Sequence, residues 1–212
     1  MDIYAALAKV YDLLDVIYFR ETGKNPREVI EHWIPNENKK LMDLCCGTLS
    51  NTLTIAKKNS ALNVIGLDLS KDMLRVAKKK AKQQGLKNVR FKCADATNTG
   101  FKDESFDYLI LGLVLHENTP SLDDALLKEA NRLLKEDGRL IVLEWAPPNK
   151  LYQLIKFAPL YLVETLSCKT FRKFYEADKE VYFRHHGFEV VEQELCNYSI
   201  VLNLKKASIS KE

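Results

Sequence analysis

Three aspartates, Asp43, Asp68 and Asp95, stand at or just after the ends of three apolar runs that predict β-strands. The carboxyl ends of parallel strands meet at one edge of a sheet, so these carboxylates are expected to border a common pocket. Carboxylates repel phosphate and favour cationic or hydrogen-bond-donating groups. The pattern therefore favours a ligand with a positively charged part. The three runs are residues 41–44, 63–69 and 88–93.

A turn of small residues, Cys45-Cys46-Gly47-Thr48, follows the first run and leads into helix-forming sequence near Ser50. In a strand–turn–helix unit the N–H groups at the helix N-terminus face an open pocket above the sheet. Gly47 lets a ligand approach the main chain without meeting a Cβ atom. The turn is too short for a Walker phosphate loop and lacks its Lys-Ser/Thr ending, and no GxGxxG motif is present.

Apolar runs alternate with helix-forming segments along the chain. This alternation predicts a three-layer, Rossmann-like α/β fold with seven strands, mostly parallel, and helices on both faces. The last two runs, 188–192 and 198–204, are joined by a short link, which implies a C-terminal antiparallel strand. The expected organisation is an N-terminal helical extension or cap (1–35), a main domain (36–204) with a helical lid at about 148–176, and a tail (205–212).

Two local signals predict where helices begin and break. Ser121 with Asp124 three residues later predicts a capping-box start for a helix that runs to Lys135. Pro159 predicts a break inside the lid helix.

Charge and cysteine content exclude several classes of protein. The 32 basic and 29 acidic residues are interspersed and give a net charge of +3, so no nucleic-acid-binding surface is indicated. The five cysteines form no CxxC pair, which indicates neither a disulfide framework nor a metal site. Reduced thiols, no visible signal peptide and no membrane-spanning run predict a cytoplasmic protein. The oligomeric state is left open.

Five segments, in order along the chain, resemble the class I S-adenosylmethionine (SAM)-dependent methyltransferases, and most of all the ubiquinone/menaquinone-biosynthesis type. They span about half of the chain. The resemblance implies SAM as cofactor, S-adenosylhomocysteine (SAH) as product and a small-molecule methyl acceptor. The segments are MDLCCGT (42–48), GLDLSKDML (66–74), CADA (93–96), FDYLILGLVLHE (106–117) and LLKEDGRLIVLE (133–144).

The resemblance also implies a role for each residue of the site. The methionine part of SAM would lie beside Asp43, Cys45 and Gly47. The adenosine part would contact the residues that follow the second and third strands. Asp68 would hold the ribose, Leu69 and Met73 would pack on the adenine, Asp95 would accept from the adenine amino group, and Ala96 would lie beside it.

One position departs from the family pattern. Members of the family commonly have a further glycine two residues after the first, and Leu49 stands there in this chain. The leucine either narrows the approach of the ligand to the backbone or points into the core.

Methyl transfer requires an acceptor held in line with the sulfonium and a pocket closed to water. By resemblance, Leu111, Gly112 and His116 would line the pocket at the end of the fourth strand. His116 is also the best candidate for a general base, because imidazole can exchange protons near neutral pH. The competing interpretation is that His116 only lines the pocket or binds a loop. Glu117 and Glu144 are second choices.

The segment 151–175 is aromatic and basic and has three possible roles. It predicts an apolar lid over a hydrophobic or aromatic acceptor such as a quinol, phenol, thiol or lipid-like molecule. It also fits peripheral contact with an anionic membrane surface. The third possibility is an ordinary helix packed on the sheet.

A SAM-dependent methyltransferase is the function that the sequence favours. Its main rival is a SAM-binding protein without methyl transfer, with a sensing or interaction role, which the lack of an unambiguous base supports. An NAD-dependent oxidoreductase is disfavoured by the missing GxGxxG motif.

Overall fold

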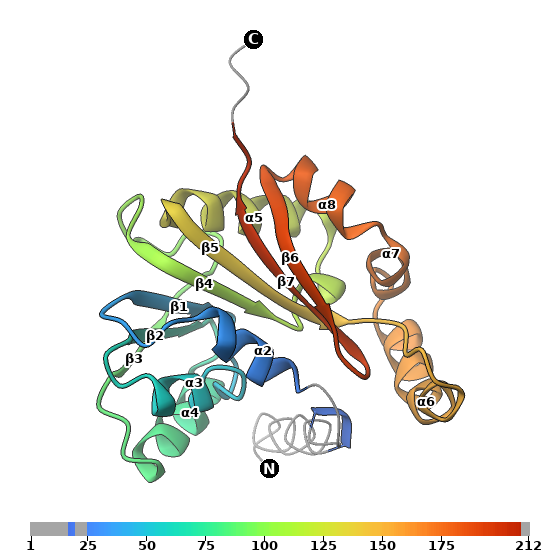
Figure 1. The fold of residues 1–212 in the computed structure, drawn as a ribbon, viewed down its shortest axis with the longest axis horizontal. Helices are drawn as coiled ribbons and strands as arrows, with labels where there is room; N and C mark the ends of the chain where they lie inside the picture. The colour runs from blue at the N-terminus through green and yellow to red at the C-terminus, as the bar shows by residue number, and fades with distance from the viewer. Residues whose placement is uncertain (1–16, 20–24, 209–212) are drawn as a thin grey trace.

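The computed structural model describes residues 17–19 and 25–208 (Figure 1). Residues 1–16 and 20–24 of the expected N-terminal helical extension and the last four residues of the expected tail therefore lie outside the described residues. Within the described part, no helix has both the length and the apolar composition needed to cross a bilayer.

Seven strands form one sheet in the order β3-β2-β1-β4-β5-β7-β6. The pairs among β3, β2, β1, β4 and β5 are parallel, and β7 runs antiparallel to both of its neighbours. This confirms the mostly parallel sheet with one antiparallel C-terminal strand. The strands are β1 (Lys40–Leu44), β2 (Asn63–Asp68), β3 (Val89–Cys93), β4 (Phe106–Gly112), β5 (Leu134–Trp145), β6 (Phe188–Leu195) and β7 (Ser199–Lys206).

Helices cover both faces of the sheet (Figure 1). On one face, Ile30 and Ile55 pack against Leu41 of β1, while the other face buries Leu127 and Phe183 in a second cluster. The first face carries α2 (Pro26–Trp33), α3 (Leu53–Lys58) and α4 (Lys71–Gln83). The second carries α5 (Pro120–Leu133), α7 (Phe171–Glu176) and α8 (Lys179–His185). The 3-10 helix η1 (Leu115–Glu117) follows β4, and α6 (Leu151–Ser167) follows β5.

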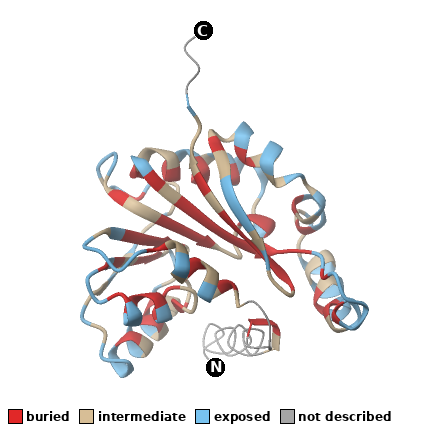
Figure 2. Cartoon of the chain, viewed as in Figure 1, coloured by how far each residue is buried: buried red, intermediate tan, exposed pale blue. Residues whose placement is uncertain are grey.

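The buried sheet is the reason why its strands are apolar on both sides. Figure 2 shows the central strands of the sheet largely buried. In β1, Leu41 belongs to the cluster on one face and Met42 and Leu44 to the cluster on the other. Side chains alternate along a strand, so Asp43 points to the same face as Leu41. The chain leaves β1 and β4 toward opposite edges of the sheet, and the crevice at such a switch point is where open α/β sheets bind ligands.

Two local expectations were wrong. Helix α5 begins at Pro120, whose ring presets the helical backbone at the first position. The N-cap is Thr119, and its hydroxyl lies against the hydroxyl of Ser121 and makes no capping bond. Helix α6 continues through Pro159 to Ser167. Phe157 and Leu160 are buried on either side of Pro159, and their packing holds the helix together there.

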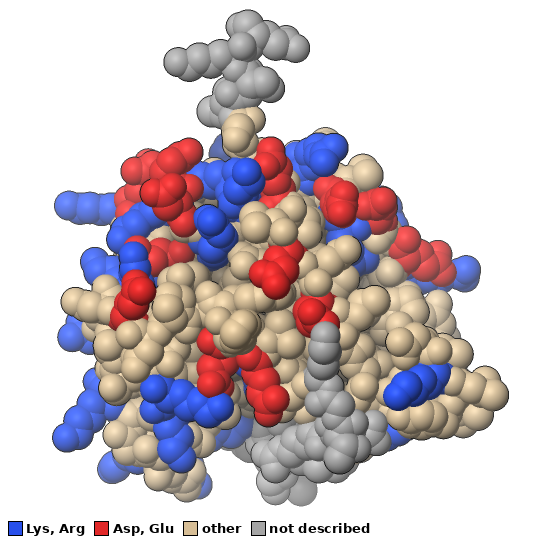
Figure 3. Space-filling view, in the orientation of Figure 1, with Lys and Arg blue, Asp and Glu red and all other residues tan. Residues whose placement is uncertain are grey.

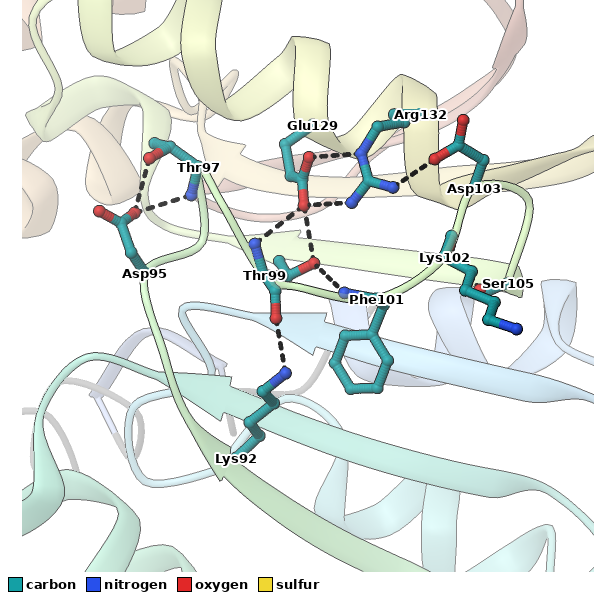
Figure 4. A network of polar contacts seen from close by, with 10 residues as sticks. All are labelled: Lys92, Asp95, Thr97, Thr99, Phe101, Lys102, Asp103, Ser105, Glu129 and Arg132. Carbon is teal, nitrogen blue, oxygen red and sulfur yellow. Dashed lines mark hydrogen bonds and ion pairs between the residues drawn. The ribbon is translucent and has the colours of Figure 1, made fainter.

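The loop between β3 and β4 is tied to α5 by a buried carboxylate (Figure 4). Glu129 accepts hydrogen bonds from the amide (2.9 Å) and the hydroxyl (2.7 Å) of Thr99, and it pairs with Arg132. Arg132 also pairs with Asp103. The Arg132 guanidinium, together with the bonds from Thr99, lowers the pKa of Glu129 to about 2. These contacts fix the loop between β3 and β4, which contains Asp95.

Candidate active site

A cavity of about 410 Å³ lies at the carboxyl ends of β1, β2, β4 and β5. Its volume is in the range of small-molecule sites, ~300–1,000 Å³. Helix α6 lies beyond the tip of β5, at the same edge of the sheet (Figure 1). Of the eleven residues that the resemblance places around SAM, six line the cavity: Cys45, Gly47, Asp68, Met73, Gly112 and His116.

The other five expected residues do not line it. Leu111 is fully buried in the core, because neighbouring side chains of β4 point to opposite faces and the next residue, Gly112, is the one at the cavity. Asp43 lies beneath the turn, 2% exposed, and accepts a hydrogen bond from the hydroxyl of Thr52. Leu69 is 72% exposed beside Asp68.

The last two belong to the loop after β3. Asp95 is tied to its own loop, where its carboxylate accepts from the amide (2.8 Å) and the hydroxyl (2.7 Å) of Thr97. The bonds from Thr97 lower the pKa of Asp95. Ala96 packs at the edge of the core cluster instead of facing the cavity.

The turn after β1 is built from three residues with positive φ: Cys45 (59°), Gly47 (50°) and Leu49 (64°). Such conformations cost non-glycine residues ~1–3 kcal/mol each and persist only where the surroundings impose them. A Cβ atom at Gly47 would meet nothing within 4 Å, so this side of the turn is open to a ligand. Leu49 is fully buried among Leu53 and the residues of α4, which answers the question left by the sequence: its side chain belongs to the core.

Asp68 connects the tip of β2 to this turn. Its Oδ2 accepts from the amide of Gly47 at 2.8 Å, and its Oδ1 accepts from the amide of Ser70 at 2.8 Å. Ser70 in turn caps α4 by accepting from the amide of Met73. The carboxylate is therefore held by the backbone on two sides at the wall of the cavity.

The thiol beside the turn is not activated. Burial and the nearby carboxylates of Asp68 and Asp43 raise the pKa of Cys45 to about 12. The thiol is therefore neutral at physiological pH and has a packing role. Burial likewise raises the pKa of Asp43 to about 7, against the opposing hydrogen bond from Thr52.

At the other end of the cavity, His116 is paired with Glu144. The Nδ1 atom of His116 lies 2.6 Å from Oε2 of Glu144, and both side chains are almost fully buried. The second oxygen of Glu144 accepts from the amides of Val114 (3.0 Å) and Leu115 (2.8 Å), which anchors the carboxylate to η1. Burial opposes a charge on His116, but Glu144 outweighs it and raises the pKa of the imidazole to about 9.

Two further carboxylates approach the same imidazole. Glu117 follows His116 in η1, and Glu164 comes from α6; both line the cavity. Oε1 of Glu117 lies 3.8 Å from Nε2 of His116. Burial raises the pKa of both glutamates, while His116 opposes that effect.

Aromatic side chains form the rest of this end of the cavity. Phe19 and Trp145 both line it and are stacked, with ring centroids 5.3 Å apart and planes 8° from parallel. Arg27 lies over the Phe19 ring at 5.5 Å and donates to the amide oxygen of Asn51 in the turn region. The cavity therefore combines the polar turn and Asp68 with a wall of stacked aromatic rings, and His116 and two glutamates also line it.

Sequence reasoning missed several of the residues that line the cavity, among them Trp145, Glu164, Phe19 and Arg27. Trp145 directly follows Glu144 at the end of β5. The rule that residues at the carboxyl ends of parallel strands border the pocket, which pointed to the aspartates, could have found it. Glu164 continues the inward stripe of α6 after Phe157 and Leu160 at helical spacing, so an acid on a buried face was the available signal. Phe19 and Arg27 come from the N-terminal extension, whose position relative to the sheet has no signal in the sequence.

Comparison with known proteins agrees with this geometry. Residues 1–167 match the model of the ubiE/COQ5 methyltransferase family. The chain is 34% identical over 181 residues to a demethylmenaquinone methyltransferase of Geobacillus sp. (strain WCH70), covering 82% of this chain and 75% of the relative. It is 36% identical over 150 residues to a demethylmenaquinone methyltransferase of Staphylococcus saprophyticus, covering 70% of this chain and 63% of the relative.

Solved structures share the fold at low sequence identity. A SAM-dependent methyltransferase from Aquifex aeolicus aligns with a TM-score of 0.69 and 17% identity over 96% of this chain and 98% of its own. The Burkholderia thailandensis 1,6-didemethyltoxoflavin-N1-methyltransferase, solved with SAH, aligns with a TM-score of 0.65 and 15% identity over 97% and 88%. The chain therefore belongs to the ubiE/COQ5 methyltransferase family, and its fold is that of the SAM-dependent methyltransferases.

Proposed function

We propose that this protein transfers the methyl group of SAM to a hydrophobic, quinol-type aromatic acceptor. The observation that carries the proposal is a single cavity that joins the carboxylate of Asp68 and the open turn at Gly47 to the stacked rings of Phe19 and Trp145. The relatives named demethylmenaquinone methyltransferase support an acceptor of this class.

The residues at the polar end fit SAM. The fixed carboxylate of Asp68 supplies acceptors for ribose hydroxyls, and Gly47 leaves space for the methionine part against the backbone. Met73 lines the cavity near Asp68, and the exposed Leu69 can cover an adenine ring. For Asp43, Asp95, Ala96 and Leu111 any effect on SAM is expected to act through the turn or the loop that each supports.

When bound, SAM supplies a methyl group already activated by the positive sulfur. The chain holds the acceptor ring between apolar and aromatic side chains and keeps water away from the reacting atoms. The acceptor gives up one proton as its new bond to the methyl carbon forms, and the sulfur keeps the electron pair of the bond that breaks. His116, just after the end of β4, lines the cavity and is the residue proposed to position the acceptor. Because Glu144 raises the pKa of its imidazole to about 9, His116 is charged at neutral pH and does not itself take up that proton.

The test is transfer of radiolabel from SAM. A reduced demethylnaphthoquinol in detergent should become labelled, whereas a thiol and a phospholipid should not. Trp145→Phe should raise KM for the quinol several-fold and leave SAM affinity unchanged in calorimetry. Tight SAM binding without labelling of any acceptor would favour the rival, a SAM-binding protein without transferase activity, and binding of NAD alone would contradict the SAM assignment.

We also propose that α6 rests on an anionic bilayer surface, where a hydrophobic acceptor would be found. Its outer side exposes Leu151 (74%), Ile155 (68%) and Leu166 (77%), and Lys150 and Lys169 are exposed at its two ends. The surface over α6 is mostly uncharged in Figure 3. Apolar side chains flanked by lysines are typical of interfacial helices. Vesicles containing phosphatidylglycerol should co-sediment with the protein, and Ile155→Ser with Leu166→Ser should abolish this.

The location of the protein is proposed to be the cytoplasm. All five cysteines are free, which suits a reducing compartment.

A further inference from the structure

The cavity holds a set of ligand atoms that methyl transfer by itself does not require. One nitrogen of His116 and one oxygen each of Glu117 and Glu164 lie within 4.8 Å of one another. Two of these residues come from η1, which follows β4, and the third comes from α6.

The ligand atoms of this set are left without hydrogen bonds. His116 is 2% exposed, and its Nε2 has Glu117 at 3.8 Å, which is beyond hydrogen-bonding distance. Within the described residues, neither the Glu117 nor the Glu164 carboxylate accepts a hydrogen bond. Only the imidazole is buried: Glu164 is half-buried and Glu117 is exposed. A buried ring nitrogen without a hydrogen bond is costly, so an additional partner is expected at Nε2.

The other nitrogen of His116 is already fixed. Glu144 holds Nδ1 at 2.6 Å and is itself anchored by two backbone amides. A carboxylate behind an imidazole orients the ring and increases the basicity of the outward nitrogen, and histidines that bind metals almost always have such a partner. The nitrogen left over is the one that faces Glu117 and Glu164.

The geometry points to a binding site for one divalent transition-metal ion, held by Nε2 of His116 and the carboxylates of Glu117 and Glu164. An ion at ~2.1 Å from each ligand keeps two ligand atoms at most ~4.2 Å apart. The 3.8 Å between Nε2 of His116 and Oε1 of Glu117 is within that limit, and all three ligand atoms lie within 4.8 Å of one another, so rotation of the two glutamate side chains would bring them around one ion.

The donor set selects the kind of ion. One imidazole and two carboxylates suit Mn²⁺, Fe²⁺ or Zn²⁺, whereas Mg²⁺ prefers oxygen ligands alone. Three carboxylates, counting Glu144, surround a single imidazole, and their field favours a dication beside it. A metal could not be expected from the sequence, because two of the ligands are adjacent and the third lies 47 positions after the second, in a different element.

Mn²⁺ is the probe for the test, because it avoids the thiols of this chain. Chelator-treated protein without SAM or acceptor is titrated, and free Mn²⁺ is followed by electron paramagnetic resonance. One ion should bind per chain with saturation below millimolar concentration, and more tightly than Mg²⁺. Glu164→Gln should weaken Mn²⁺ at least tenfold, while the exposed Glu180→Gln in α8 serves as the matched control and should bind like the wild type.

Two further readouts separate coordination from general attraction of cations. Pulsed paramagnetic resonance of the bound Mn²⁺ should show coupling to an imidazole ¹⁴N, which His116→Gln should remove. Mn²⁺ should raise Tm in the wild type and in Glu180→Gln but not in Glu164→Gln, because a ligand stabilises only the fold that binds it. No saturable binding, equal binding by Glu164→Gln, tighter binding of Mg²⁺, or no nitrogen coupling would each overturn the site. None of these measurements depends on the methyl acceptor.

Discussion

The carboxylate of Asp68 accepts a hydrogen bond from the backbone amide of Gly47, with 2.8 Å between Oδ2 and the nitrogen. This bond joins the end of β2 to the turn that follows β1. The same carboxylate also accepts from Ser70 at the start of α4. One side chain thereby sets the relative position of the two segments between which SAM is proposed to bind.

Asp68→Ala should weaken SAM binding by ~1–3 kcal/mol, the usual cost of leaving a buried polar partner unpaired. Asp68→Asn keeps one acceptor oxygen and should lose less. Calorimetry with SAM measures both. Asp72→Ala, which removes a partly exposed carboxylate of α4 paired with Arg75, is the control and should bind as the wild type does. Unchanged affinity of Asp68→Ala would remove Asp68 from the proposed site.

Leu49→Gly should lower the free energy of unfolding. Removing a buried leucine side chain costs ~2–5 kcal/mol, and relief of the positive φ of 64° returns ~1–2 kcal/mol. The net loss in urea denaturation is therefore expected to reach at most ~4 kcal/mol. Leu49→Ala is the matched variant: it loses nearly the same packing but keeps the strain, so it should be no more stable than Leu49→Gly. An alanine variant clearly more stable than the glycine variant would contradict the strain at this position.

The sequence predicted the position of a site residue correctly where a local rule of strand geometry determines that position. Strand ends carry the pocket residues of a parallel sheet, which placed Asp68 and His116 at the cavity. A second local rule, that neighbouring side chains of a strand point to opposite faces, separates Leu111 in the core from Gly112 at the cavity. Positions that depend on packing between distant segments could not be predicted this way. Phe19 reaches the cavity only because an N-terminal segment packs against Trp145 at the end of β5.

Asp43→Asn should stabilise the protein more at pH 8 than at pH 5. Burial, and to a lesser degree Asp68, raise the pKa of Asp43 to about 7, against the hydrogen bond from Thr52. The folded state therefore holds a proton that the unfolded chain has released, and the wild type loses stability as pH rises from about 4 to about 7. Three pKa units correspond to a few kcal/mol, ~1.4 per unit.

Urea denaturation at the two pH values measures this effect. The variant lacks the titrating group, so the difference in unfolding free energy between variant and wild type should grow with pH. Asp72→Asn, with its carboxylate at the surface, should show no such trend. A difference that is constant between pH 5 and pH 8 would show that Asp43 is ionised in the folded state throughout this range.

Glu129→Gln should destabilise the protein at pH 7, and the loss should shrink in acid. The guanidinium of Arg132 and the bonds from Thr99 lower the pKa of Glu129 to about 2, so its ionised form is favoured in the folded state. This stabilisation is present above the unfolded pKa of ~4.5 and is lost as pH falls toward 2. Hydrogen bonds to charged groups contribute ~1.5–3 kcal/mol, which is the loss expected at neutral pH. The network also holds the loop that contains Asp95, so hydrogen exchange of the Thr99 amide should accelerate in the variant. Glu136→Gln, at an exposed position, is the control and should change neither the free energy of unfolding nor this exchange rate.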